Sequence, residues 1–422
     1  MFKKILDNNF FNREIVILFL LYLGLIIGFI LGENSTGGAI LDYLNQKKVS
    51  EQFSLNFFNT LNQYDNFATR HSPILIIILG IFEKFNIPDH IIRLIHLHFC
   101  LLLPFFFYKC LEIKFQKIDK NIFFLLSFLI FLSPTFRSLA IWPDSRITGL
   151  LFFTLGILFY LKFIDEKKFS YVILNTLFVA CSAYFSPNFS IFSIYFILNF
   201  ISHYGINSKK IFLIFLTNGI LALPAFYYLF FMDVNFLSNS AAVGIETNEK
   251  KFFNNIFNDI LITFTLIFFY IFPFIITKII KIDNPLKIKN IFISFLIFII
   301  CTINFDYNLS YTGGGIFLQF SNIIFNNNYI FYVIGFISIL ICLTFLNTNR
   351  FNVLIFLLIL LNNPQYTVYH KYFDPFLLIL FFTIFDLKFQ INRVIFNKNY
   401  LIVFFYFLSF LIISNFKYLW KI

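Results

Sequence analysis

Long apolar stretches, separated by shorter polar intervals, run through the whole chain. An apolar stretch of about 17 to 25 residues is long enough to cross the hydrocarbon core of a bilayer as a helix. The predicted spanning segments are 15–32, 89–110, 121–137, 146–164, 171–185, 189–204, 211–232, 259–280, 289–303, 329–346, 351–361, 374–389 and 400–416. Several are shorter than a full span, so neighbours would merge or re-enter, and about 11 to 13 transmembrane helices are expected. The pattern predicts an all-α polytopic membrane protein, with residues 1–422 forming a single integral-membrane domain.

The composition supports this class and excludes others. Hydrophobic residues make up 59% of the chain, whereas about half the residues of a soluble globular protein are apolar. The net charge is +11, but Lys and Arg lie mainly in short loops between apolar segments, where they orient a membrane protein. We therefore expect a lipid bilayer, and no nucleic acid, as a partner. The five Cys residues are scattered singly through apolar segments, which is typical of buried core positions.

The loops alternate between two kinds along the chain. Lys and Arg concentrate in the loops near 109–120, 167–168, 209–210, 278–289 and 388–398, and at the N-terminus. By the positive-inside rule these loops and the N-terminus are cytoplasmic. The loops expected outside are richer in Gly, Asn, Asp and Tyr; they are 33–88, 138–145, 186–188, 233–255, 304–328 and 362–372. The first apolar segment lacks a small-x-small cleavage site after it, so we expect an uncleaved first helix.

The first outside loop, 33–88, is the longest polar interval and holds most of the groups able to do chemistry. Ser35 and Thr36 are good N-caps, so a helix is predicted over 39–48. The groups able to do chemistry there include Glu33, Asp42, Glu51, Asp65, Arg70 and His71. A functional site is therefore expected in this loop.

The second part of that loop predicts helices on the membrane surface. Phe53, Phe57 and Leu61 recur at i, i+4 and i+8, which is typical of an amphipathic helix lying on a bilayer. The apolar segment 74–85 is too short to span before Pro88, so we expect a second interfacial helix there. Both helices would hold the loop at one face of the membrane.

Glu33 and Asp42 are the leading candidates for a catalytic acid or base. If residues 39–48 are helical, Asp42 lies on the second turn and Glu33 lies before the cap, so both side chains can face one cavity. A carboxylate at a low-dielectric boundary has a raised pKa and can accept a proton from a hydroxyl. The structural alternatives are two solvated loop acids, or Glu33 as an interfacial anchor.

Several short motifs together resemble a known family. They are Arg70-His71-Ser72-Pro73 before the apolar segment 74–85 and Arg93, then Ser133-Pro134, Ser186-Pro187-Asn188, and Tyr369-His370-Lys371-Tyr372 before Pro375. Their order and layout resemble the GT-C superfamily of polyprenyl-phosphate-dependent glycosyltransferases, such as the protein O-mannosyltransferases, the aminoarabinose transferases and RgtA/B/C/D-like proteins. Many members carry an adjacent Asp-Glu pair in the first loop, whereas this chain has Glu33-Asn34 and a separate Asp42.

The resemblance implies a GT-C-like bundle with juxtamembrane helices in the first outside loop. It implies transfer of a sugar from a polyprenyl-phosphate donor to an envelope glycan, lipid or protein acceptor, in a bacterial inner membrane with the active loop periplasmic. Asp42, with Glu33 as the alternative, would deprotonate the acceptor hydroxyl or help to hold a divalent metal ion such as Mg or Mn. The residues expected to bind the phosphate or the acceptor are Lys371, Arg70, His71, Arg93, Asp144 and Tyr372.

Other readings stay open beside this one. Lys371 also fits an interfacial Lys that reaches toward water, and Asp144 also fits a simple pair with Arg146. Arg93 lies inside a predicted helix, where an Arg is costly unless it is functional or paired with an acid. The alternative functions are a transporter or lipid-glycan flippase, and an O-antigen polymerase or ligase-like enzyme. The sparse charges in the helix interiors count against transport, and the early position of the large loop counts against a polymerase.

Overall fold

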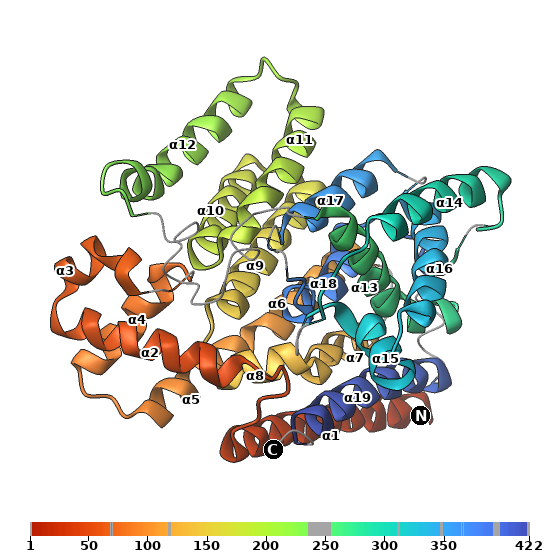
Figure 1. The fold of residues 1–422 in the computed structure, drawn as a ribbon, viewed down its shortest axis with the longest axis horizontal. Helices are drawn as coiled ribbons and strands as arrows, with labels where there is room; N and C mark the ends of the chain where they lie inside the picture. Colours follow the sequence, from red (N-terminus) through yellow and green to blue (C-terminus); the bar gives the residue numbers. More distant parts are fainter. Residues whose placement is uncertain are drawn as a thin grey trace. The chain divides into compact units, whose positions relative to one another are not determined.

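The structure is a computed structural model. It describes residues 2–67, 69, 71–116, 120–234, 255–282, 284–309, 313–346, 349–363, 365, 367–390 and 397–419, and of these the side chains of 2–14, 120, 397–398 and 417–419 lie outside the description. The described residues form α-helices and short 3-10 turns with no β-strand among them (Figure 1). Helices satisfy every backbone hydrogen bond internally, which is what a bilayer requires. The predicted all-α class is therefore confirmed.

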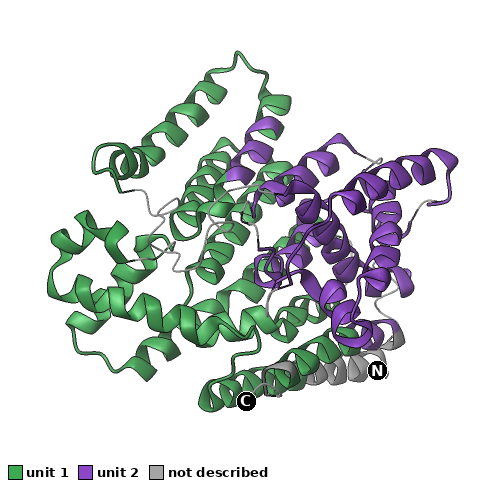
Figure 2. Cartoon of the chain, in the orientation of Figure 1, with its two compact units in different colours: residues 1–190, 199–239, 404–422 green, residues 191–198, 240–403 purple. Residues whose placement is uncertain are grey.

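The chain divides into two compact units, which are described separately (Figure 2). Unit 1 comprises Met1–Ser190, Asn199–Asn239 and Phe404–Ile422, and unit 2 comprises Ile191–Leu198 and Ser240–Val403. The helices of unit 1 are α1 (Phe2–Leu31), α2 (Ala39–Leu55), α3 (Phe57–Asn62), α4 (Pro73–Lys84), α5 (Asp89–Cys100), α6 (Leu102–Lys114), α7 (Lys120–Phe128), α8 (Pro134–Ile141), α9 (Ser145–Glu166), α10 (Phe169–Phe185) and α12 (Lys209–Phe230). Those of unit 2 are α13 (Ile256–Ile276), α14 (Ile288–Ile303), α15 (Gly315–Phe325), α16 (Tyr329–Leu346), α17 (Arg350–Leu361) and α18 (Phe376–Thr383). Two helices, α11 (Ser193–Tyr204) and α19 (Asn397–Leu419), have residues in both units.

Six of the described helices are long and apolar enough to cross a membrane. They are Asp89–Lys114, Ser145–Glu166, Lys209–Phe230, Ile256–Ile276, Tyr329–Leu346 and Asn399–Phe416. Shorter apolar helices cover Ile15–Leu31, Phe169–Phe185, Ile288–Ile303, Gly315–Phe325 and Arg350–Leu361. Length and composition therefore support an integral membrane protein with several spans, while the number of 11 to 13 stays a prediction.

The segment 121–137, predicted as one helix, is bent. Asn121–Leu132 and Pro134–Ile141 meet at an angle of 67°. Pro134 has no N–H to continue the first helix, and the Ser133 side chain instead caps the second by accepting a hydrogen bond from Phe136 N at 2.9 Å. The bend turns α8 away from the line of α7.

A second difference lies in the loop 304–328, where the structure has the helix α15. Gly314 and Gly315 both have positive φ, at +82° and +74°, a backbone region that glycine enters without strain. The two glycines turn the chain sharply, and α15 begins directly after the turn. The glycine-rich part of this loop is therefore a turn that leads into a helix.

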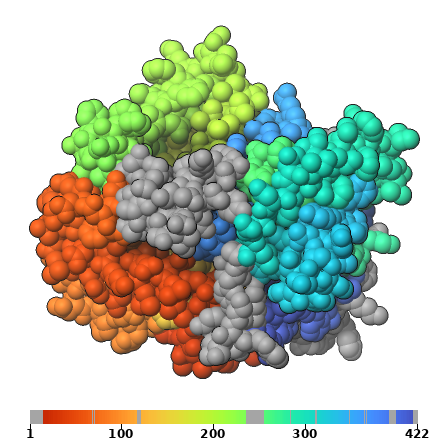
Figure 3. Space-filling model, in the orientation of Figure 1, coloured from red at the N-terminus to blue at the C-terminus, as the bar shows by residue number. Residues whose placement is uncertain are grey.

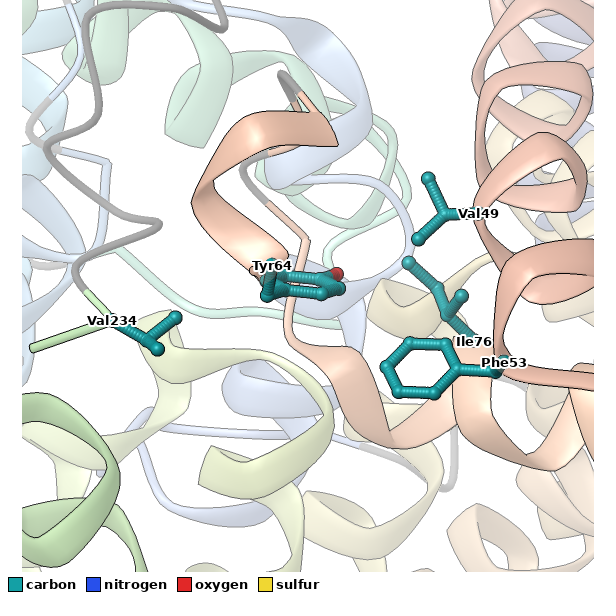
Figure 4. Close-up of a cluster of buried hydrophobic side chains, with 5 residues drawn as sticks. All are labelled: Val49, Phe53, Tyr64, Ile76 and Val234. Carbon is teal, nitrogen blue, oxygen red and sulfur yellow. The ribbon is translucent and has the colours of Figure 1, made fainter. Parts of the chain in front are cut away.

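The first outside loop is helical, as predicted, but Phe53, expected on a membrane-facing side, points into the protein. Phe53 is buried at 4% exposure and packs with Val49, Tyr64, Ile76 and Val234 (Figure 4). Asn56 ends α2 with an extended φ of −148°, so α2 and α3 are separate helices and the predicted apolar stripe is broken. Phe53 and Leu61 pack in the cluster that includes Ile76 of α4, whereas Phe57 is 39% exposed, so the prediction that the three residues form one membrane-facing stripe is wrong. Residues of α2 to α4 make one continuous surface in the space-filling view (Figure 3).

The opposite side of α2 is the exposed apolar one. Leu41, Leu44 and Leu55 are 65%, 45% and 80% exposed. They are spaced along the face of α2 that points away from α4, beside the charged Lys48. Exposed apolar side chains beside a cation are typical of a helix at a membrane interface, and an interfacial position for this loop stays a prediction.

Candidate functional site

A buried ion pair holds the start of the first outside loop. Arg137 on α8 contacts the Glu33 carboxylate through Nε, at 2.8 Å from Oε1 and 3.0 Å from Oε2, and through Nη2, at 2.5 Å from Oε2. The side chains are 9% and 8% exposed. Arg137 Nη2 also donates to Gly24 O at 2.8 Å. A guanidinium donating twice to one carboxylate is a strong, directional contact, so Glu33 joins α1 to α8.

Glycines of α1 make room for this pair. A Cβ added to Gly28 would lie 2.3 Å from Glu33 Oε2 and 2.9 Å from Arg137 Nη2. A Cβ on Gly24 would lie 3.9 Å from Arg137 Nη1. Gly24 and Gly28 are four residues apart and therefore share one face of α1. The ion pair fills the shallow notch that these two glycines leave.

Hydroxyl and indole contacts fasten the same loop to α8. Ser35 Oγ donates to Pro134 O at 2.9 Å and lies 2.8 Å from Ser138 Oγ. Thr36 N donates to Ser138 Oγ at 3.1 Å, and Trp142 Nε1 donates to Glu33 O at 2.9 Å. Ser35 and Thr36 were predicted to cap α2, but Gly38 occupies the N-cap position and makes no side-chain cap bond. The Ser35 hydroxyl and the Thr36 backbone N–H make tertiary contacts with α8 instead.

Arg93 stacks on Trp142 beside this attachment. Its Cζ lies 3.5 Å from the Trp142 ring centroid and 5.0 Å from that of Phe29, and its Nε donates to Ile141 O at 3.1 Å. Arg93 Nη2 is buried and has no hydrogen-bond partner in the part of the chain that the structure describes. A guanidinium between aromatic rings with donors to spare can receive an anion.

Tyr43, the residue after Asp42 on α2, packs against Trp142 of the Arg93–Trp142 stack. The ring of Tyr43 is 5.8 Å from the ring of Trp142. Tyr43 OH donates to Asp89 Oδ1 at 2.6 Å, and Lys47 Nζ donates to the same oxygen at 2.8 Å. Burial raises the pKa of the Tyr43 hydroxyl well above its ordinary value, so Tyr43 stays a hydrogen-bond donor. Asp42 itself is half-buried on this part of α2.

A polar seam continues from Asp42 along α2. Gln46 and Ser50 follow Asp42 at intervals of four residues, so the three share one side of the helix. Ser50 Oγ donates to Glu83 Oε1 on α4 at 2.7 Å. Gln46 is fully buried, and both its amide atoms, like Glu83 Oε2, have no hydrogen-bond partner among the described residues. Burial raises the pKa of the Glu83 carboxyl, although the Ser50 bond opposes this.

His71 lies beside Ser145, the residue that follows Asp144 at the start of α9. His71 Nδ1 lies 3.4 Å from Ser145 Oγ, and Ser72 Oγ hydrogen-bonds to Tyr184 O. Asp144 is buried, and its Oδ1 accepts from Arg146 N at 2.7 Å as the N-cap of α9. The expected Asp144–Arg146 pair thus exists as a capping bond to the backbone.

The late motif lies in unit 2, where its His370 contacts a tyrosine of α13. His370 Nε2 is 2.8 Å from Tyr270 OH on α13. Gly314 N donates to Val368 O at 2.9 Å, which joins the motif to the start of α15. Lys371 Nζ lies 5.7 Å from the Tyr369 ring centroid. The predicted Tyr372 is half-buried, and its hydroxyl donates to Gln365 Oε1 at 3.1 Å.

Some expectations remain outside what the structure describes or supports. Arg70 lies outside the described residues. Within the described ranges, no three His, Cys, Asp or Glu side chains gather to hold a metal ion, and Glu33 is occupied by Arg137. The side chains present therefore do not fit a metal centre, and the chemistry proposed below assigns no step to one.

Sequence reasoning missed three buried polar residues. Arg137 ends a predicted span, where an unpaired Arg is costly, and that cost was the available signal. Gln46 looks like an ordinary polar helix residue in sequence. Asp259, in the first turn of α13, is 5% exposed, and its Oδ1 has no partner among residues with described positions.

Comparisons of the chain with protein-family models, with curated proteins and with solved structures give no match. The fold and these contacts define the class: an α-helical integral membrane protein with several candidate spans. The first loop is helical, and its Glu33 forms an ion pair with Arg137 of α8, the second half of the bent segment 121–141.

Proposed function

We propose that this protein is a GT-C-type membrane glycosyltransferase that transfers a sugar from a polyprenyl-phosphate donor to a cell-envelope acceptor on the outer face of the membrane. One observation supports this best. The first loop folds into α2 and α4, and α2 holds Asp42 one residue from Tyr43, whose ring faces the Arg93–Trp142 stack. Tyr43 thus connects the helix that carries Asp42 to Arg93, whose Nη2 has no hydrogen-bond partner among the described residues.

Asp42 is the proposed base. Glu33 is occupied by a bidentate contact with Arg137, and removing it from that contact would leave a buried guanidinium without its partner. Asp42 is half-buried, so it is sheltered but reachable. In the proposed reaction the acceptor hydroxyl oxygen bonds to the anomeric carbon as the bond between that carbon and the phosphate oxygen breaks. The hydroxyl proton passes to Asp42, and the polyprenyl phosphate leaves with the bonding electrons.

The phosphate gains negative charge in this step, so cations should stabilise it. Arg93 carries a buried Nη2 with no hydrogen-bond partner in the described structure, and a guanidinium binds phosphate in a bidentate geometry. Arg70, Lys371 and Tyr372 keep the phosphate-binding or acceptor-binding roles that the family resemblance implies, and His71 and Asp144 border the acceptor side in the proposal.

The test uses the full chain in lipid nanodiscs with labelled polyprenyl-phosphate hexoses and pentoses and an envelope extract as acceptor. Asp42→Asn should lower kcat by about 10² to 10⁴-fold, because a general base contributes a factor of that size. Arg93→Gln should raise the KM for the donor. Transfer by Asp42→Asn at the wild-type rate would overturn the role of Asp42, and a wild-type protein that transfers no sugar from any donor would overturn the function.

Glu51→Gln is the matched control for Asp42→Asn. Glu51 is an exposed acid on the same helix, so its replacement changes the charge equally without touching the proposed site. It should keep wild-type kcat and KM. Equal losses in both variants would mean that charge on α2, rather than Asp42, supports transfer.

A further inference from the structure

Two basic loops of unit 1 lie together at one end of its helices. One loop joins α9 to α10, and the other joins α11 to α12. Their flanking rings are in contact, with centroids 5.7 Å apart for Phe163 and Tyr204, 5.1 Å for Phe163 and His203, and 6.1 Å for Phe169 and Tyr204. These rings bring the charged residues of both loops to a single surface.

We call this surface the basic end. Its cationic side chains are Lys162, Lys167, Lys168, Lys209, Lys210 and, when protonated, His203. Two acids offset part of the charge: Asp165 accepts from Gln116 Nε2 at 2.8 Å, and Glu166 pairs with Lys168 at 2.6 Å. The positive side chains outnumber the negative ones, so the basic end attracts anions.

The ammonium groups of Lys210 and Lys167 lie close to these aromatic rings. Lys210 Nζ lies 4.5 Å from the Tyr204 ring centroid and 5.9 Å from that of Phe169. Lys167 Nζ lies 5.4 Å from the Phe163 centroid. Aromatic rings beside Lys are typical of the boundary between headgroups and acyl chains.

A hydroxyl inside this group lacks a partner. Tyr204 OH is buried, and no described residue hydrogen-bonds to it. A buried hydroxyl without a partner is costly, and a phenol O–H donates well to a phosphate oxygen. Tyr204 therefore offers one donor beside the ammonium of Lys210.

Apolar surface continues directly from these donors. On the first turns of α12 Phe212, Leu213 and Leu216 are 67%, 43% and 47% exposed. Such side chains can pack along acyl chains while the charged residues stay in the headgroup layer. A ligand with a phosphate at one end and hydrocarbon at the other matches both parts.

We propose that the basic end binds the headgroup of an anionic membrane phospholipid. The lipid phosphodiester accepts from Lys210 and from Tyr204 OH, Lys167 adds a second positive charge, and the acyl chains lie along the start of α12. The positive-inside rule places these loops on the cytoplasmic side, where anionic lipids attract basic segments. The site is separate from the proposed transfer site and does not depend on it.

The test measures lipid retained by the full chain in nanodiscs of phosphatidylcholine alone or mixed with phosphatidylglycerol, by native mass spectrometry, with the melting temperature as a second readout. Wild type should retain phosphatidylglycerol in preference to phosphatidylcholine and melt higher in the mixed discs. Lys210→Gln should weaken retention about tenfold, and Tyr204→Phe should weaken it a few-fold, because each removes one donor to phosphate. Both replacements keep the fold, since Lys210 is exposed and Phe keeps the ring.

The matched control is Lys287→Gln with Lys289→Gln. These two exposed Lys residues precede and begin α14 in unit 2, so the change in net charge is at least as large but lies elsewhere. The control should retain lipid like wild type. Equal loss in the control and in Lys210→Gln would overturn the proposal, and so would stabilisation by inorganic phosphate or glycerol 3-phosphate equal to that by phosphatidylglycerol, which would assign the site to a soluble phosphate.

Discussion

Two partly buried glutamates of unit 1 differ in the hydrogen-bond partners of their carboxylates. Glu33 receives a bidentate guanidinium from Arg137 and lies in the notch at Gly28. Glu83 receives one hydroxyl from Ser50, while its other oxygen has no partner among the described residues. Burial raises the pKa of the Glu83 carboxyl, and the hydrogen bond from Ser50 opposes that rise only in part.

Glu33 therefore has a structural role in its ion pair with Arg137, whereas Glu83 and Gln46 have polar atoms without a hydrogen-bond partner among the described residues. A buried charge with a well-placed partner is kept in place because losing either partner is costly. Buried polar groups without partners cost stability instead, and proteins keep such groups mainly at functional sites. Gln46 lies one helical turn from Asp42. Buried polar atoms of Gln46 and Glu83 that have no hydrogen-bond partner among the described residues therefore lie near the proposed base.

The largest expected effect comes from removing the cation. Arg137→Met leaves the Glu33 carboxylate buried without its partner and should lower the free energy of unfolding by about 3 to 5 kcal/mol. Denaturant titration of the purified protein in micelles measures it. The double variant Glu33→Leu with Arg137→Met should recover most of that loss, because no buried charge remains. A double variant as unstable as the single one would contradict the ion pair.

The next effect tests the notch. Gly28→Ala adds a Cβ that would lie 2.3 Å from Glu33 Oε2, and overpacking of this kind costs about 1 to 3 kcal/mol. Gly219→Ala on α12 is the control, since nothing lies within 4 Å of its added Cβ. It should be neutral or gain up to about 1 kcal/mol from helix propensity. If both variants have equal midpoints of thermal unfolding, the notch does not hold the pair.

Replacing the buried Gln46, which lies near Glu83, should increase stability. Gln46→Leu replaces a fully buried amide with no described partner by an apolar side chain, and should stabilise the protein by about 1 to 3 kcal/mol. Gln52→Leu, at an exposed position of the same helix, should change stability by no more than about 0.5 kcal/mol. Thermal unfolding compares the two. Destabilisation by Gln46→Leu would mean that Gln46 has a partner in the folded protein.

The smallest effect is a pH dependence at Glu83. Its pKa in the folded protein is raised above the ordinary 4.5 by burial, so the folded state binds the proton more tightly than the unfolded state. Its contribution to stability is therefore full below pH 4.5 and is lost as pH rises through the raised pKa. The difference in melting temperature between wild type and Glu83→Gln, measured from pH 4 to 8, should shift in favour of Glu83→Gln as pH rises. A constant difference would contradict the raised pKa.

Much of the helical organisation follows from local sequence. The apolar segments predicted over 146–164 and 329–346 coincide with α9 and α16. Pro73 occupies the first turn of α4, as its place before an apolar segment predicts. The length of an apolar segment and the residues that start a helix depend only on neighbouring residues, so they can be predicted from the sequence.

The face that each helix presents was harder to predict. Phe53 and Leu61 form an amphipathic stripe, and an amphipathic stripe fits a membrane and a neighbouring helix equally well. Only the position of α4, whose Gly80 would place a Cβ 2.8 Å from Phe53 Cβ, decides between them. The roles of Ser35 and Thr36 changed for the same reason, since α8 offers them partners that the local sequence does not contain.

The sequence by itself determined that this chain is a helical membrane protein, because hydrocarbon length and loop charge are read within windows of about 20 residues. Tertiary structure decided that Glu33 is the acid held by Arg137. Arg137 lies 104 residues from Glu33, and the attraction between two charges depends on their separation in space rather than along the chain. The proposed base and the structural carboxylate look alike in sequence, and their surroundings make them different.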